Sequence, residues 1–172
     1  MTRYVSISSE NLLHGLMDLQ GYTFVKNGCI IRFKEHVSTK RYHPKLTEAD
    51  RQIFHSNSEI LWDELLRLLN YGPEPCIYVS SYEGNWQPSN LFDSDKLSEG
   101  QYVMQTNHTE VLREIFYMSL EHRTFPVFVS ADRLVAVIPT DHLDMFIAYS
   151  DPHKISSHMI SEDLERIEWQ QQ

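Results

Sequence analysis

The sequence is poor in the residues on which several specialised small folds depend. Its two cysteines, Cys29 and Cys76, are too few for a disulfide scaffold, and we expect both to be buried, unreactive thiols. The six glycines stand singly, so no glycine-rich loop is available to hold a phosphate group. No apolar run approaches the roughly 20 residues that a helix needs to cross a bilayer. These absences exclude a disulfide-stabilised fold, a nucleotide-binding loop and a membrane-spanning helix.

Basic residues are also scarce. The chain has 24 acids and 15 bases, which gives a formal net charge of -9. A protein of this sign is repelled by nucleic acids and anionic lipids, so we expect neither nucleic acid nor membrane as a partner. The first six residues lack the basic and apolar regions of a signal peptide, which predicts a cytoplasmic location. With 172 residues, we expect a single domain over 1–172.

Apolar periodicity predicts both helices and strands. Three stretches carry apolar residues at helical spacing, over 10–20, 59–70 and 110–122. Thr47 and Asp50 form a near capping box ahead of a further helical stretch. Short apolar runs predict strands near Tyr4 and over 29–34, 76–82 and 102–105. The C-terminal segment, about 151–172, is polar, and its residues from Ser161 to Trp169 predict a short helix.

A first hairpin is predicted around Asn27-Gly28. This dipeptide stands between two β-rich runs, 22–26 and 29–34. Both residues tolerate the positive φ that a type I′ turn requires, so the two runs are expected to pair.

A second hairpin is predicted farther along the chain. Near-continuous apolar strands over 125–130 and 134–139 bracket Ala131-Asp132-Arg133, which is typical of a central position in a sheet. The stretch 143–149 fits either a further strand or a short helix. Because hairpins outnumber alternating strand and helix units, the fold class predicted is α+β, a single domain whose mostly antiparallel sheet is covered by helices on one face.

No local motif fixes a reaction. The nine histidines include no His-Glu-x-x-His, so we predict no metal centre, and nothing indicates a cofactor. Asp141, His142 and Asp144 follow an apolar strand, a common place for acid–base residues, although Asp and Thr there also favour a turn. We therefore assign no catalytic residue. A small hydrolase or transferase with an active site near Asp141 and His142 is the alternative reading.

The distribution of charge is more informative than any motif. Residues 1–86 hold 10 acids and 9 bases, a net of -1, whereas residues 87–172 hold 14 acids and 6 bases, a net of -8. Acids attract a basic partner, and aromatic side chains among them can anchor the complex. The alternative is that these acids serve only solubility. The predicted partner-binding residues are Trp86, Asp93, Asp95, Glu99, Asp132, Asp141, Asp144, Tyr149, Glu162, Asp163, Glu165 and Trp169.

In size, acidity, α+β organisation and lack of a catalytic motif, the chain resembles the small cytosolic immunity proteins of bacterial contact-dependent inhibition and other polymorphic toxin systems. That resemblance implies a protein that binds one cognate toxin, often a basic nuclease, and blocks its active site. Two other classes stay open: an enzyme whose site is assembled from distant residues, and a regulatory or adaptor module.

Overall fold

The structure is a computed structural model that describes residues 3–6, 28–35, 47–69, 77–83, 102–106, 108–121, 125–130, 135–149, 155 and 160–168. Its helices are α2 (Glu48–Leu68) and α3 (Thr109–Leu120). Its strands are β1 (Arg3–Ser6), β2 (Gly28–Phe33), β3 (Ile77–Glu83), β4 (Tyr102–Thr106), β5 (Phe125–Val129), β6 (Val135–Pro139), β7 (Asp144–Tyr149) and β8 (Leu164–Glu168).

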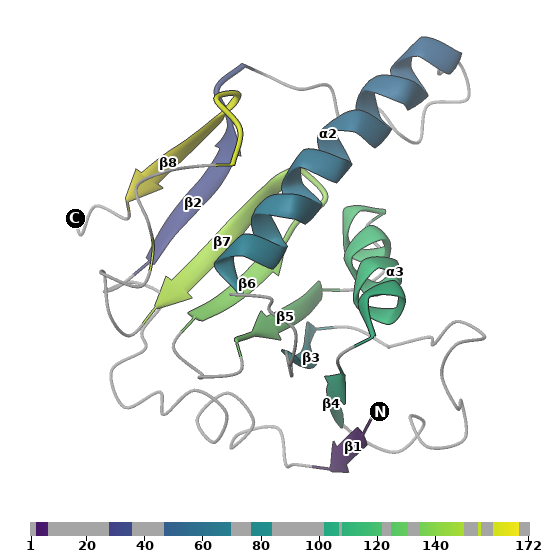
Figure 1. Cartoon of the computed structure of the whole chain (residues 1–172), viewed down its shortest axis with the longest axis vertical. Coiled ribbons are helices and arrows are strands. Elements are labelled where there is room, and N and C mark those ends of the chain that lie inside the picture. The colour runs from purple at the N-terminus through teal and green to yellow at the C-terminus, as the bar shows by residue number, and fades with distance from the viewer. Residues whose placement is uncertain are drawn as a thin grey trace.

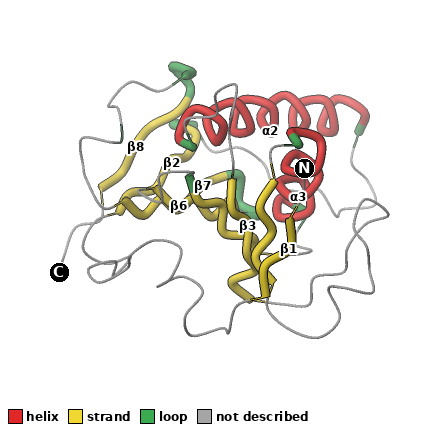
Figure 2. The backbone as a smooth tube through the Cα atoms, turned by 60° about the horizontal axis from the view of Figure 1, so that its bottom comes forward, coloured by secondary structure: helices red, strands yellow, loops and turns green. Residues whose placement is uncertain are grey.

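The eight described strands form one sheet in the order β1-β4-β3-β5-β6-β7-β2-β8. Every neighbouring pair is antiparallel. Figure 2 shows α2 and α3 together on one face of this sheet. The predicted α+β class, with an antiparallel sheet and helices packed on it, is confirmed.

Helix α2 joins two stretches that the sequence pattern had kept apart. The predicted capping box is present: Asp50 N donates to Thr47 Oγ1 (3.2 Å), and Thr47 N donates to Asp50 Oδ2 (2.9 Å). The second half of the helix buries Leu61, Leu65 and Leu68 against the core. Its first turns are exposed, and in Figure 1 they project beyond the strands.

The main core lies between the helices and the sheet. Strand register aligns Phe128, Val137, Ile147 and Cys29 in one row across β5, β6, β7 and β2, and all four side chains are fully buried. Helix α3 contributes Phe116, whose ring lies 5.5 Å from that of Trp62 on α2. Burial of this apolar surface provides the main driving force for the fold.

The central strands are also apolar on their second face. Val127, Val129, Ala136 and Ala148 alternate with the residues of that row and are fully buried too. Burial on both faces explains the near-continuous apolar runs of β5 and β6. The predicted pairing of these strands and their central position are confirmed.

Two local predictions are wrong. The pairing of 29–34 with 22–26 around Asn27-Gly28 is wrong, because β7 and β8 occupy both edges of β2; residues 22–27 themselves lie outside the described residues. The prediction of a short helix from Ser161 to Trp169 is also wrong, since Leu164–Glu168 is the strand β8. The stretch 143–149, which fitted either a strand or a short helix, contains the strand β7. The predicted helix over 10–20 lies outside the described residues.

Among the described residues, no helix combines the length and the apolar character needed to cross a membrane.

Candidate functional site

Five of the predicted acidic residues meet at one end of the sheet. Asp141 and Asp144 belong to the turn between β6 and β7 and to the start of β7, whereas Glu162, Asp163 and Glu165 belong to the turn before β8 and to β8 itself. Both strands begin where β2 ends, at the upper end of these strands in Figure 1. We call these five residues the acidic end.

Arg32 on β2 lies at the centre of the acidic end. Its register partners are Asp144 on β7 and Glu165 on β8. Since adjacent strands lie about 4.8 Å apart, the backbones of these two acids are about 10 Å apart across β2. Arg32 Nε donates to Glu165 Oε1 at 2.8 Å, an ion pair whose side chains are 54% and 34% exposed. One exposed pair of this kind contributes little stability, and it neutralises only one of the five acids.

The turn before β8 presents the most accessible acids. Glu162 and Asp163 are both exposed. The turn is held locally, because Asp163 N donates to Ser161 Oγ (3.2 Å) and Leu164 N donates to the Ser161 carbonyl (3.3 Å). Lys34 N donates to the Asp163 carbonyl (2.8 Å), which ties the turn to the end of β2. These two carboxylates are therefore displayed on an ordered turn.

The Asp141–Asp144 segment is built as a turn rather than as an assembled acid–base site. Thr140 Oγ1 donates to Asp144 Oδ1 and accepts from His142 N (3.1 Å). His142 is 75% exposed, and its Nε2 lies 3.8 Å from Asp141 Oδ1. An acid–base pair needs hydrogen-bond contact and a substrate position beside it. No observation here favours the alternative of an enzyme with Asp141 and His142 in its active site.

Leu143 closes this turn in an unusual conformation. Its φ is 58°, in the left-handed region that leucine normally avoids. Its side chain is 1% exposed and belongs to the core. Burial of the leucine side chain offsets the energetic cost of the left-handed backbone. The core packing of Leu143 therefore fixes the turn that carries Asp141 and Asp144.

The remaining predicted residues do not join the acidic end. Tyr149 lies at the opposite end of β7 and is 5% exposed, so its ring packs in the core instead of facing a partner. The others lie outside the described residues: Trp86, Asp93, Asp95, Glu99, Asp132 and Trp169.

A polar cluster surrounds Tyr149 and was not predicted. The Tyr149 hydroxyl donates to Glu168 Oε2 (2.9 Å) and accepts from Arg166 Nη2 (3.3 Å). Arg166 also forms an ion pair with Glu168 and donates from Nη1 to the Ile155 carbonyl (3.1 Å). These contacts engage both terminal nitrogens of the guanidinium and pair its charge with Glu168, so Arg166 has a structural role within the cluster.

Cys29 lies beside this cluster, opposite Glu168 in the β2–β8 ladder. Burial raises the pKa of its thiol to about 11, although Arg166 acts in the opposite direction. A reactive cysteine needs a lowered pKa and access to solvent. Cys29 is thus buried, as predicted, and both its burial and its raised pKa oppose reaction of the thiol, whereas Cys76 lies outside the described residues.

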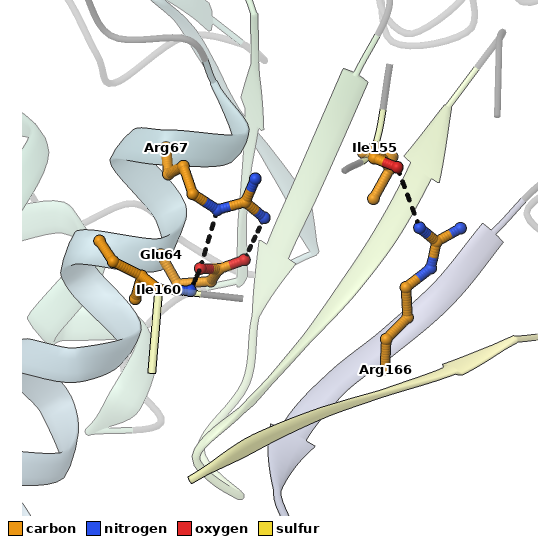
Figure 3. A network of polar contacts seen from close by, with 5 residues as sticks. All are labelled: Glu64, Arg67, Ile155, Ile160 and Arg166. Atoms are coloured by element: carbon orange, nitrogen blue, oxygen red, sulfur yellow. Dashed lines mark hydrogen bonds and ion pairs between the residues drawn. The ribbon is translucent and has the colours of Figure 1, made fainter. Parts of the chain in front are cut away.

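Sequence reasoning also missed a buried carboxylate on α2. The Glu64 side chain is fully buried and accepts hydrogen bonds from Arg67 Nε (3.0 Å), from Arg67 Nη2 and from the Ile160 backbone N (3.0 Å). Figure 3 shows it directed at the Ile160 amide. One signal could have revealed it, since Glu64 falls within the apolar stripe of Leu61, Leu65 and Leu68.

A second unpredicted cluster joins the two helices. Glu59 on α2 accepts hydrogen bonds from Tyr117 and Arg113 on α3. Burial alone would raise the pKa of Glu59, but these donors outweigh it and lower that pKa. A carboxylate committed to two donors is a structural link between helices, not a general base.

Tyr117 gives this cluster a measurable pH dependence. Burial and the Glu59 carboxylate raise its pKa from 10.0 to about 12. The neutral phenol therefore adds stability below the unfolded pKa, and this contribution is lost as pH rises from about 10 to 12. We expect the unfolding free energy to fall more steeply over this window in the wild type than in Tyr117→Phe. Urea titrations across the window would measure this, and parallel curves for the two proteins would contradict it.

Within the described residues, no group of three or more His, Cys, Asp or Glu side chains is arranged to hold a metal ion. The acidic end is thus the arrangement of predicted residues that the structure brings together. No protein-family model, curated protein or solved structure matches this chain, so its function must be argued from the acidic end itself.

Proposed function

We propose that this protein is a cytoplasmic immunity protein that binds the basic surface of a cognate toxin domain, such as a nuclease, through the acidic end and blocks its active site. The observation that carries the proposal is the convergence of five acids from two chain segments, with one of them paired to Arg32. Acids gathered at one place create a directed negative potential, which a scattered solubility charge does not.

The chemistry of a nuclease explains why such a surface would inhibit it. A nuclease binds phosphate groups with lysine and arginine side chains. Carboxylates offer the same donors a negatively charged acceptor of similar strength. Glu162 and Asp163 are the most exposed of the five, so they are the first contacts that we expect a basic partner to make.

We expect the cognate toxin domain to be encoded by a neighbouring gene, and the experiment uses that domain in a catalytically inactive form. Its association and dissociation rates with the protein are measured from low to physiological salt. We expect the triple reversal Glu162→Lys, Asp163→Lys and Glu165→Lys to slow association by about 10- to 100-fold at low salt. The difference in association rate between this variant and the wild type should become smaller as the salt concentration rises. Salt screens charges over about 8 Å and so weakens the attraction between the acidic end and the toxin domain.

A matched control reverses three exposed acids on the helices: Glu48, Asp63 and Glu110. Both triple variants change the net charge from -9 to -3, so only the position of the change differs. The control should associate nearly as fast as the wild type. Equal slowing by both variants would mean that the acids serve solubility and that the acidic end is not the interface.

A further inference from the structure

Two charged side chains contact the backbone at Ile155 and Ile160, which precede β8 in the sequence. Glu64 on α2 accepts from the Ile160 backbone N, and Arg166 on β8 donates to the Ile155 carbonyl. Figure 3 shows the two contacts on separate elements, one on the helix and one on the strand. Ile155 itself is buried in the core at 4% exposed. The backbone is therefore fixed at two points, five residues apart.

The burial of the Glu64 carboxylate carries a high free-energy cost. A carboxylate removed from water is strongly disfavoured unless it is paired and hydrogen-bonded. Glu64 is fully buried, and a leucine at this position would extend the apolar stripe of α2. Among the described residues, the one main-chain donor to Glu64 is Ile160, directly before the turn that carries Glu162 and Asp163.

We infer that Glu64, with Arg166 at the second contact, is a positioning residue that fixes the acidic turn and the edge strand β8 against the helical core. The inference rests on the proposed function for its biological meaning but not for its test. β8 needs such anchoring, because among the described strands it is the last of the sheet and pairs with β2 alone. A rigid turn presents its carboxylates to a partner with less loss of entropy on binding.

Cys29 offers a built-in reporter of this anchoring. It lies opposite Glu168, it is fully buried, and its thiol is next to Arg166. Opening of β8 from β2 would expose it to a water-soluble thiol reagent, whereas opening of β1, β4 or β3, which are not neighbours of β2, would not. Glu64 has no contact with Cys29 among the interactions described above, so a change at Glu64 does not alter the intrinsic reactivity of the thiol.

The experiment measures the rate of Cys29 modification in a Cys76→Ser background. Hydrogen bonds to charged groups change an equilibrium constant by about 10- to 100-fold. We therefore expect Glu64→Gln, which keeps an acceptor but loses the charge, to speed modification about tenfold. Glu64→Leu, which loses the acceptor, should speed it more. The acceleration should persist at low urea, because it reports local opening and not global unfolding.

The matched control is Glu59→Gln, the same substitution on the same helix, where the carboxylate contacts α3 instead. It should leave the rate of Cys29 modification near that of the wild type. The inference is overturned if Glu64→Gln labels no faster than Glu59→Gln, or if its acceleration follows the urea dependence of global unfolding. Because glutamine closely matches glutamate in volume, Glu64→Gln keeps the test decisive even if Glu64→Leu does not fold.

This result is separable from that of the toxin-binding experiment. Faster Cys29 modification in Glu64→Gln, with association unaffected by charge reversal at the acidic end, would support the anchoring and reject the proposed function. Unchanged modification, with slower association in the charge-reversed variant, would reject the anchoring and leave the proposed function in place.

Discussion

Replacing Arg67 with methionine is expected to lower the free energy of unfolding by about 3–5 kcal/mol, measured by urea denaturation. Arg67 donates two hydrogen bonds to Glu64, whose side chain is fully buried. Without the guanidinium, the Ile160 amide is the one donor left to the carboxylate among the described residues, and an uncompensated charge stays in the core. The loss measures the cost of leaving Glu64 unpaired, not the net value of the pair.

Two comparisons make this prediction specific. Arg113→Met breaks the ion pair with Glu59, whose side chains are 44% and 32% exposed, and should cost only about 0–1 kcal/mol. The double variant Arg67→Met, Glu64→Leu should regain most of the loss, because no buried charge remains. An Arg67→Met protein within about 1 kcal/mol of the wild type would contradict the burial of Glu64 in solution.

The second large effect is expected at Leu143. Leu143→Ala should destabilise the protein by about 2–5 kcal/mol, because it deletes a buried side chain and leaves a cavity. Alanine keeps the strain of a left-handed backbone, at φ 58°, whereas glycine does not. We therefore expect Leu143→Gly to be about 1 kcal/mol more stable than Leu143→Ala.

That order reverses the usual one, in which glycine is less stable than alanine in regular structure by about 0.5–1 kcal/mol. Ala148, buried in β7, provides the reference position, where Ala148→Gly should be destabilising. If Leu143→Gly proved less stable than Leu143→Ala, the left-handed conformation would not hold in solution.

The structural features that depend on residues close together in the sequence were predicted correctly. The Thr47–Asp50 capping box, helix α3 and the pairing of β5 with β6 all follow from residues a few positions apart. The errors concern pairing partners. Asn27-Gly28 carries a real turn propensity, but β7 and β8 take both edges of β2, which only the complete sheet determines.

The candidate site likewise has features that the sequence predicts and features that depend on the complete sheet. The clustering of acids in the second half of the chain was visible, yet their meeting at one end of β2 needed the strand order. Arg32, which lies between Asp144 and Glu165, comes from a distant part of the sequence and gave no signal. Tyr149 looked like a surface aromatic among acids, although its five-residue separation from Asp144 along β7 places it in the core.

The position of β2 in the sheet also affects how the chain folds during its synthesis. Arg32 and Glu165, which pair in the finished sheet, are 133 residues apart in the sequence. During synthesis, β5 and β6 can pair as soon as they emerge, whereas β2 must wait for almost the whole chain before either edge is covered. Closing such a long loop slows folding, and an uncovered apolar strand attracts other chains. A polypeptide that stalls before β7 and β8 are synthesised would thus expose β2 and Cys29 and be a substrate for chaperones.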